Sequence, residues 1–441
     1  MDNKYNIIII GGGPGGYKTA TYAASKDLSV LLVERAELGG TCLNCGCIPT
    51  KTYARHAEIL ETLGQSGVYG IDNLSFDFNF QTVVERKNQV VETLRNGIST
   101  LLSAPGITIV KGMARLSSPH SVVVDGVEYT ADDIIIATGS SAKSLPLAEL
   151  DEQTVCDSTW LLDTKELPQR ICIVGAGVIG MEFASILNAF GCEVSVVEFL
   201  KECLPALDSD IAKRLRKCLE KRGVAFYMQS ALKSVRGNSV VFERKGKETT
   251  LEVDKVLLAV GRKANVDDEL LGGLPIDCGK QGIIVDDNMQ TSVEHIYAVG
   301  DVNGRQMLAH AAEMQGRRAV NAIVGEADDI RFDIMPAAIF ASPEAACVGK
   351  TEDELKASSM AYHCDKHYYR ANGKAVAMNE TEGMLKLLSD ESGKIVGCHV
   401  YGAHAADLVQ EVSVLMCRNT TVKQLHDMTH IHPTLSEVLI D

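Results

Sequence analysis

Three cysteines lie within six residues of one another near the start of the chain, at Cys42, Cys45 and Cys47. Closely spaced cysteines in a chain with no sign of export indicate redox chemistry or metal binding rather than structural cross-links. Positions five apart in a straight helix are separated by a rise of about 7.5 Å, which exceeds the usual Cα separation of a disulfide. A bridge between Cys42 and Cys47 therefore needs a distorted turn, which Gly46 and Pro49 allow.

Two other roles of these cysteines compete with a redox pair. A metal site needs a fourth ligand, which this segment does not offer and which a distant thiol such as Cys364 would have to supply. Thiols that only pack as small buried side chains are the other possibility. The spacing favours the redox pair, so we expect no metal.

The cysteine segment follows an apolar run, a glycine-rich turn, a helical pattern and a second apolar run that ends in an acid. That order is the fingerprint of a dinucleotide-binding unit. The first glycine permits the tight turn, the second lets the backbone approach a pyrophosphate at the helix N-terminus, and the third allows close helix–strand packing. The positions are 6–10 for the first strand, Gly11, Gly13 and Gly16 for the turn, 17–26 for the helix, and 29–34 for the second strand, with Glu34 as the acid.

The same fingerprint recurs with an offset of 164 residues. One glycine triplet is weak support for a nucleotide site, but two complete copies with matching acids predict two nucleotide-binding domains. The second copy comprises the strand 171–174, the turn of Gly175, Gly177 and Gly180, a helix that ends at Phe190, and the strand 194–198 with Glu198 as its acid.

The rest of the chain closes these two copies and adds a third part. Helix 80–102 interrupts the first copy, which closes with a strand over 134–136, and the second copy closes with a strand over 256–260. A further buried strand, 294–299, delivers Asp301 to a turn, and the strands 384–388 and 395–400 and the helix 405–418 follow Pro336. We predict an α/β fold with two Rossmann-like domains, 1–148 with 266–335 and 149–265, and an α+β interface domain, 336–441.

Length and composition limit the classes of function. The chain has 441 residues, a hydrophobic share of 46% and a net charge of −15. This length exceeds what one core supports, and the negative charge argues against nonspecific nucleic-acid binding. The sequence has no basic-then-apolar leader and no apolar run near the roughly 18 residues of a membrane span. We expect a cytoplasmic protein with mostly reduced cysteines and no nucleic-acid or membrane partner.

A flavin is the natural redox link between a dithiol and a nicotinamide. Two nucleotide-binding domains and a dithiol therefore predict a flavoprotein that carries electrons between thiols and a pyridine nucleotide. Glu198 can accept hydrogen bonds from a ribose 2′-hydroxyl and repels a 2′-phosphate. The residues after it, 199–202, include one lysine and no arginine, which favours NAD over NADP.

Over essentially its whole length the chain resembles the pyridine nucleotide–disulfide oxidoreductases, and among them most the dihydrolipoamide dehydrogenases. The fold and the cofactors FAD and NAD follow from this resemblance as expectations. The motifs that carry it are Gly39 to Cys42 with Gly46 to Lys51, Gly175 to Glu182, Val197 to Leu200, Val299 to Asp301, and His432-Pro433-Thr434 with Glu437.

The resemblance implies roles for four residues near the flavin. Cys42 is the sulfur that exchanges with the substrate, and Cys47 is the sulfur next to the flavin. Lys51 and Glu182 are the family's ion pair beside the flavin.

His432 and Glu437 match the family's dyad, which completes the site of the partner subunit and therefore implies a homodimer. A dithiol needs a base to become a nucleophile, and the carboxylate fixes the tautomer of the imidazole. Without the resemblance, a histidine before a proline is most simply a turn residue. We expect His426 and His430 to be surface or turn histidines.

The remaining cofactor residues come from the motifs and the resemblance together. For FAD we predict Gly11, Gly13, Gly16, Glu34, Thr41, Lys51, Ala114, Thr138, Gly139, Ser140, Asp301, Met307, Leu308, Ala309 and His310. For NAD we predict Gly175, Gly177, Val178, Ile179, Gly180, Glu182, Glu198 and Gly261.

The activity implied is the oxidation of dihydrolipoamide by NAD⁺, with the lipoyl group borne on a carrier protein of a 2-oxoacid dehydrogenase or glycine-cleavage system. The alternative is an oxidant- or metal-defence NAD(P)H-dependent flavin disulfide reductase of the same superfamily. A scaffold without activity would lack the redox cysteines or the dyad, and neither is missing. Two departures from the family pattern are Cys45, which we expect to pack as a small hydrophobe where an apolar residue is usual, and the end of the chain at Asp441.

Overall fold

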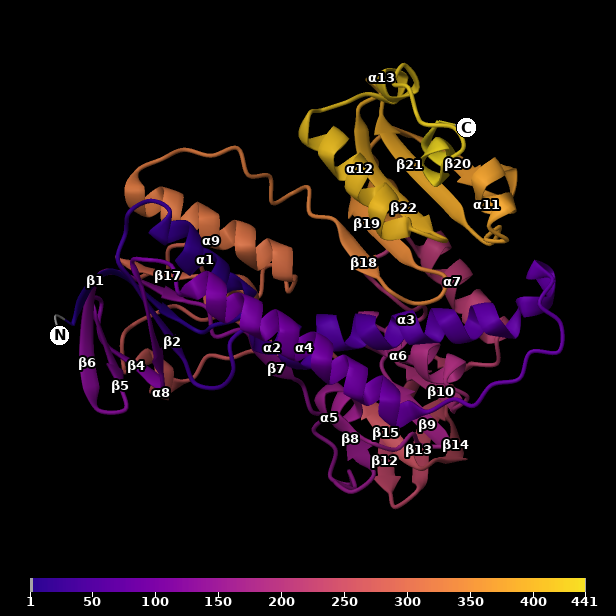
Figure 1. Ribbon diagram of the computed structural model, residues 1–441, viewed down its shortest axis with the longest axis horizontal. Coiled ribbons are helices and arrows are strands. Elements are labelled where there is room, and N and C mark those ends of the chain that lie inside the picture. The colour runs from indigo at the N-terminus through magenta and orange to yellow at the C-terminus, as the bar shows by residue number, and fades with distance from the viewer. Residues whose placement is uncertain (1–2, 441) are drawn as a thin grey trace. The chain divides into compact units, whose positions relative to one another are not determined.

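The computed structural model describes residues 3–440, and its chain divides into two compact units (Figure 1). The first unit comprises residues 1–52, 82–143 and 261–330. The second comprises residues 53–81, 144–260 and 331–441. Two long helices, α3 (Cys47–Gly64) and α4 (Phe80–Leu102), contribute residues to both units.

The first unit is built on a 7-stranded sheet with the order β3-β2-β1-β6-β5-β4, in which β17 pairs with β6. The central strands β1 and β2 are apolar on both faces, as expected of a buried parallel sheet. Helices α1 and α9 lie side by side (Figure 1). The elements of this unit are β1 (Lys4–Ile10), α1 (Pro14–Ala24), β2 (Val30–Glu34), α2 (Gly40–Cys45), β3 (Ile107–Lys111), β4 (Ala114–Ser118), β5 (Ser121–Val124), β6 (Val127–Ile136), β7 (Ser140–Ala142), β16 (Arg262–Ala264), α8 (Asp268–Leu271), β17 (Ile296–Ala298), η2 (Gly300–Asn303) and α9 (Ala309–Val324).

The second unit contains a 5-stranded parallel sheet with the order β11-β10-β9-β15-β8 and a 3-stranded antiparallel sheet, β12-β13-β14. One hydrophobic cluster joins the two sheets, with Val174 and Val197 from the first and Val240 and Phe242 from the second. The elements are η1 (Ser66–Tyr69), β8 (Val155–Cys156), α5 (Ser158–Asp163), β9 (Arg170–Val174), α6 (Val178–Ala189), β10 (Glu193–Glu198), α7 (Ser209–Lys221), β11 (Ala225–Met228), β12 (Ser230–Arg236), β13 (Ser239–Arg244), β14 (Lys247–Glu252) and β15 (Lys255–Leu258).

The chain after residue 330 adds another 5-stranded sheet to the second unit, with the order β18-β19-β22-β21-β20. Its strands are antiparallel, and α12 covers it through a core that includes Leu385, Val400 and Leu408. The elements are β18 (Ala337–Ile339), β19 (Ala345–Gly349), α10 (Glu352–Ala357), β20 (Tyr362–Tyr368), η3 (Tyr369–Ala371), α11 (Gly373–Ala377), β21 (Met384–Asp390), β22 (Ile395–Tyr401), α12 (Ala405–Cys417), α13 (Val422–His426) and η4 (Leu435–Leu439).

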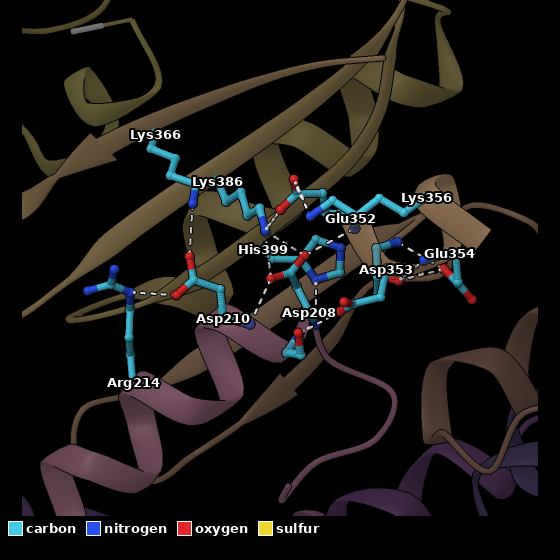
Figure 2. A network of polar contacts seen from close by, with 12 residues as sticks. Asp208, Asp210, Arg214, Glu352, Asp353, Glu354, Lys356, Lys366, Lys386 and His399 are labelled. Atoms are coloured by element: carbon cyan, nitrogen blue, oxygen red, sulfur yellow. Dashed lines mark hydrogen bonds and ion pairs between the residues drawn. The ribbon is translucent and has the colours of Figure 1, made fainter. Parts of the chain in front are cut away.

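A buried ionic cluster connects α7 to this last sheet (Figure 2). Asp208, the N-cap of α7, accepts hydrogen bonds from Lys386 on β21, and Lys386 also lies 2.5 Å from Glu352. His399 on β22 accepts a hydrogen bond from the backbone N–H of Asp208 at its Nδ1 (3.3 Å), and its Nε2 lies 3.0 Å from the Lys350 carbonyl. Burial lowers the pKa of His399, so the neutral ring serves as donor on one side and acceptor on the other.

The α/β class is confirmed, and several predicted boundaries hold. Helix α4 spans the predicted 80–102, and α12 ends one residue before the predicted end. The first helix begins at Pro14, not Tyr17, because proline suits the first turn of a helix, where no backbone N–H is needed. The division into three domains stays a prediction. Within residues 3–440 the structure has no helix that is both long and apolar enough to cross a membrane.

Candidate active site

The two glycine turns have the same construction. In the first unit a Cβ on Gly16 would lie 1.7 Å from the Gly11 carbonyl oxygen, and in the second a Cβ on Gly180 would lie 1.9 Å from that of Gly175. Each helix can pack this closely on its strand only because the third glycine lacks a side chain. Neither α1 nor α6 has a side-chain cap at its N-terminus. A Cβ on Gly177 would meet no protein atom within 4 Å, so the second turn has room for a phosphate.

Each fingerprint acid is bound to its own glycine turn. Glu34 accepts a hydrogen bond from the backbone N–H of Gly12 (2.6 Å), and Glu198 accepts one from Ala176 (2.6 Å). Each carboxylate also accepts a bond of 2.7 Å from the backbone N–H two residues after itself. A carboxylate has further lone pairs, so both acids stay able to accept bonds from ribose hydroxyls.

The redox segment contains the expected distorted turn. Cys42 lies in α2, which ends at Cys45, and Cys47 begins α3. Between the helices Gly46 has φ −144° and ψ −112°, and a Cβ there would lie 2.8 Å from the Thr41 carbonyl oxygen. The break brings the Cys42 side chain within hydrogen-bonding distance of Cys47.

The electrostatics of Cys42 follow from its neighbours. The hydrogen bond with Cys47 and burial raise the pKa of Cys42, while the positive charge of Lys51 acts to lower it. Cys47 itself is exposed. The two sulfurs therefore differ in environment, and Cys42 needs an external base to react as a thiolate.

Asn44 holds α2 in place and was missed by the sequence analysis. Its Nδ2 donates to the carbonyl oxygens of Leu38 and Gly40, both at 3.0 Å. Its Oδ1 accepts from Arg95 on α4 through Nε (3.1 Å) and Nη2 (2.7 Å). No local sequence signal marks this pair, because the two residues lie 51 positions apart.

Asp301 lies at the end of a chain of polar contacts within the first unit. The Ser140 hydroxyl donates to Asp301 Oδ2 at 2.5 Å, and Arg262 donates to the Ser140 hydroxyl (2.7 Å) and carbonyl (2.6 Å). Thr138 is fixed similarly, since it exchanges hydrogen bonds with Asn265. Arg262 and Asn265 position two predicted flavin ligands and were not predicted themselves.

His432 and Glu437 form a hydrogen-bonded pair in the second unit. His432 Nδ1 lies 2.8 Å from Glu437 Oε1, and the other carboxylate oxygen accepts from the backbone N–H of Thr434 (2.8 Å). The bonds from Thr434 and His432 lower the pKa of Glu437. The His432 side chain is 79% exposed. Its Nε2 is therefore the nitrogen that can exchange a proton with a molecule outside this chain segment.

The expectation for His430 is wrong. Its side chain is only 6% exposed, and its Nε2 lies 3.0 Å from Glu411 on α12. The contacting glutamate lies 19 positions away in the sequence, and no local pattern predicts such a contact. His426 is exposed, as expected.

The predicted site residues fall into both units. The predicted Lys51–Glu182 pair joins different units and stays a prediction; within its own unit, buried Glu182 accepts a bond from the backbone N–H of Phe340 (2.9 Å). Within residues 3–440 no group of three or more His, Cys, Asp or Glu side chains is arranged to hold a metal ion. The first unit holds Gly11, Gly13, Gly16, Glu34, Thr41, Cys42, Cys47, Lys51, Ala114, Thr138, Gly139, Ser140, Gly261, Asp301, Met307, Leu308, Ala309 and His310, and the second holds Gly175, Gly177, Val178, Ile179, Gly180, Glu182, Glu198, His432 and Glu437.

The family profiles and the curated relatives that match this chain agree with one another. The profile of the pyridine nucleotide-disulphide oxidoreductases matches residues 5–316, and that of their dimerisation domain matches residues 335–441. A dihydrolipoyl dehydrogenase of Chlamydia muridarum is 36% identical over 447 residues, which cover 99% of this chain and 96% of that protein. One of Bacillus subtilis is 35% identical over 460 residues, which cover 100% and 97%.

A solved structure shows similarity to the whole chain. It is the Cu(II) complex of the HOCl-induced flavoprotein disulfide reductase RclA from Escherichia coli. The TM-score is 0.87 at 29% sequence identity, and the match covers 99% of this chain and 98% of that one.

Proposed function

This chain belongs to the pyridine nucleotide-disulphide oxidoreductase family, and we propose that within it the chain is a dihydrolipoyl dehydrogenase that oxidises protein-bound dihydrolipoamide with NAD⁺. The observation that carries the proposal is the pairing of His432 with Glu437, 2.8 Å apart and exposed on the imidazole side. An enzyme that oxidises a dithiol must remove two thiol protons, and this pair is built to accept one.

The substrate reacts with the chain's own sulfurs in two exchange steps. A substrate thiolate attacks Cys42 of the Cys42–Cys47 disulfide, and Cys47 leaves as a thiolate. The second substrate thiol then attacks the mixed disulfide, so that the substrate leaves as a disulfide and the chain keeps two reduced sulfurs. His432 takes the proton of each attacking thiol. Bound flavin supplies the two-electron link from this dithiol to the nicotinamide.

The first unit fits FAD. The uncapped N-terminus of α1 follows the glycine turn and suits a pyrophosphate. Glu34 is fixed beside that turn for ribose hydroxyls, and Asp301 is held by Ser140 for the polar chain of the flavin. We assign Ala114 and Met307 to His310 to the same cofactor by their place in the family motifs.

The second unit fits NAD better than NADP. A cavity of about 680 Å³ beyond β10 is lined by both basic and acidic side chains; the basic ones include Lys201, Arg216 and Arg244. Arg216 lies outside the segment 199–202 that follows the acid of the second fingerprint. Its guanidinium is already paired with Glu202 at 2.6 Å and also with Glu220. Because these acids neutralise it, Arg216 is not available to a 2′-phosphate, and the preference for NAD rests on Glu198. Glu198 then selects the free 2′-hydroxyl of NAD.

The active form is a homodimer in this proposal. The dimerisation-domain match over residues 335–441 supports it. The exposed imidazole of His432 on this domain also supports it, because it can serve the Cys42 of a second copy. The substrate is a lipoyl group on a carrier protein.

An anaerobic titration with dihydrolipoamide, followed by NAD⁺, tests the proposal. We expect a long-wavelength absorbance from a thiolate close to the flavin, and then formation of NADH. Cys42→Ser is expected to lose turnover of dihydrolipoamide and keep the flavin. Reduction by NADH or NADPH without any response to dihydrolipoamide would move the chain to the oxidant-defence branch, which the similarity to RclA makes the second candidate.

A further inference from the structure

Cys45 is the one cysteine of the redox segment that the proposed reaction does not use. It lies at the end of α2, three positions after Cys42, whereas Cys47 begins α3. Six other cysteines of the described chain are buried, but Cys45 is only partly so. Its place beside the redox pair and its partial exposure are not those of a cysteine that only fills a core.

The helix itself places Cys45 within disulfide distance of Cys42. Residues three apart in an α-helix lie one turn apart on the same face, with Cα atoms about 5 Å from each other. Disulfides join Cα atoms about 4.4 to 6.8 Å apart. The pair Cys42–Cys45 meets this condition inside α2, while the pair Cys42–Cys47 depends on the break at Gly46. Cys42 therefore has two partners within reach.

We infer that Cys45 is a second exchange partner of Cys42. The Cys45 thiolate attacks the Cys42 sulfur of the Cys42–Cys47 disulfide, the Cys42–Cys45 bond forms, and Cys47 leaves as a thiolate. One S–S bond forms as another breaks, and the proton that Cys45 gives up returns to Cys47, so no external oxidant takes part. This inference rests on the proposed function, because turnover supplies the starting disulfide.

The surroundings favour this direction of exchange. The hydrogen bond between Cys42 and Cys47 and the burial of Cys42 raise the pKa of the Cys42 thiol, so Cys47 is the better leaving thiolate when Cys45 attacks the disulfide. Attack on Cys47 instead would join the last residue of α2 to the first residue of α3 across the break at Gly46, where no helical spacing sets the distance. The bonds of Asn44 to Gly40 and to Arg95 hold α2 together, so Cys42 and Cys45 keep their helical spacing.

The product is an oxidised form in which a substrate thiol that attacks Cys42 displaces Cys45 instead of Cys47. Its Cys47 is a thiol, and its Cys42 is tied to Cys45. A dithiol that attacks the Cys42–Cys45 bond returns the chain to the working form. Cys45 thus gives the protein a reversible resting state.

Thiol mapping of the holoprotein tests the inference. The protein is oxidised with lipoamide, quenched in acid and labelled with N-ethylmaleimide; it is then reduced, labelled with iodoacetamide and cleaved with trypsin. The three cysteines fall in one tryptic peptide, residues 36–51, and fragmentation shows which one carries the first label. We expect first label on Cys47 in a fraction on the order of a tenth of the molecules or more, and on Cys45 in the rest.

Two variants sharpen the test. In Cys47→Ser, oxidised lipoamide should close Cys42–Cys45 and leave the peptide without first label. Cys45→Ser should also carry no first label, because only the Cys42–Cys47 pair remains. First label on Cys45 alone in the wild type, or first label on both remaining cysteines of Cys47→Ser, would overturn the inference and leave the proposed function intact. First label on all three wild-type cysteines would instead refute the redox pair and the proposed function with it.

Discussion

The ammonium group of Lys386 lies 2.8 and 2.9 Å from the two carboxylate oxygens of Asp208, and the two side chains are 1% and 0% exposed. Asp208 is the N-cap of α7, the first helix after the Glu198 turn, whereas Lys386 lies in the last sheet (Figure 2). A buried ion pair of this kind stabilises little relative to apolar residues of the same shape, but the loss of one partner strands the other charge.

Removal of the Lys386 charge should therefore destabilise the protein strongly. For Lys386→Met we expect a loss on the order of 3 kcal/mol or more, read as a lower urea midpoint of the second unit. Lys366→Met is the matched control, because Lys366 pairs with Asp210 at 2.9 Å but is 36% exposed. That change should cost less than about 1 kcal/mol. Equal shifts in the two variants would show that the Asp208–Lys386 pair is not buried in solution.

The same cluster predicts a loss of stability in acid. Burial opposes ionisation of Glu352, but hydrogen bonds from Lys356, Lys386 and Tyr362 outweigh it and lower its pKa to about 2. A carboxyl with a depressed folded pKa stabilises fully above its unfolded pKa of about 4.3 and loses this contribution as pH falls towards the folded value. The urea midpoint should thus fall between about pH 5 and pH 3. Glu352→Gln should reduce that slope, whereas Glu391→Gln at an exposed position should not.

Loss of the imidazole should affect thiol chemistry and not cofactor binding. His432→Gln is expected to lower kcat for dihydrolipoamide by about 10² to 10⁴, the usual contribution of a general base. Glu437→Gln should have a smaller effect, because the ring remains but loses the carboxylate that orients it. His426→Gln is the control, since His426 is exposed at the end of α13. Steady-state rates and flavin content, measured on the same samples, separate an effect on turnover from an effect on cofactor binding. Normal turnover in His432→Gln would rule out the dyad.

Glu198 should set the choice of nicotinamide cofactor. Its removal takes away hydrogen bonds from a charged acceptor, each worth about 1.5 to 3 kcal/mol, so Glu198→Ala should lower the preference for NADH over NADPH about tenfold or more. Glu198→Gln keeps the shape and should remove mainly the repulsion of a 2′-phosphate. Glu193→Ala, at the exposed start of the same strand, is the control. An unchanged ratio of kcat/KM for the two cofactors in Glu198→Ala would mean that another residue reads the ribose.

Local patterns predicted the parts of the site that local structure builds. The glycine turns, their acids and the break at Gly46 all follow from residue types at short spacing. Contacts between residues far apart in the chain could not be predicted in this way. The Asn44–Arg95, His430–Glu411 and Asp208–Lys386 pairs exist because packed helices and sheets bring their backbones together. No short stretch of a single sequence indicates which distant residues will be in contact.

The bonds of Glu34 and Glu198 to the backbone of their own turns have a consequence for binding. These bonds hold both turns in shape, because each acid accepts two backbone N–H groups of its own turn. Nucleotide binding at such preorganised loops sacrifices little conformational entropy of the protein. The main entropic cost of binding then falls on the nucleotide itself. Fragments that carry only its adenosine and phosphate part should therefore bind at the second turn.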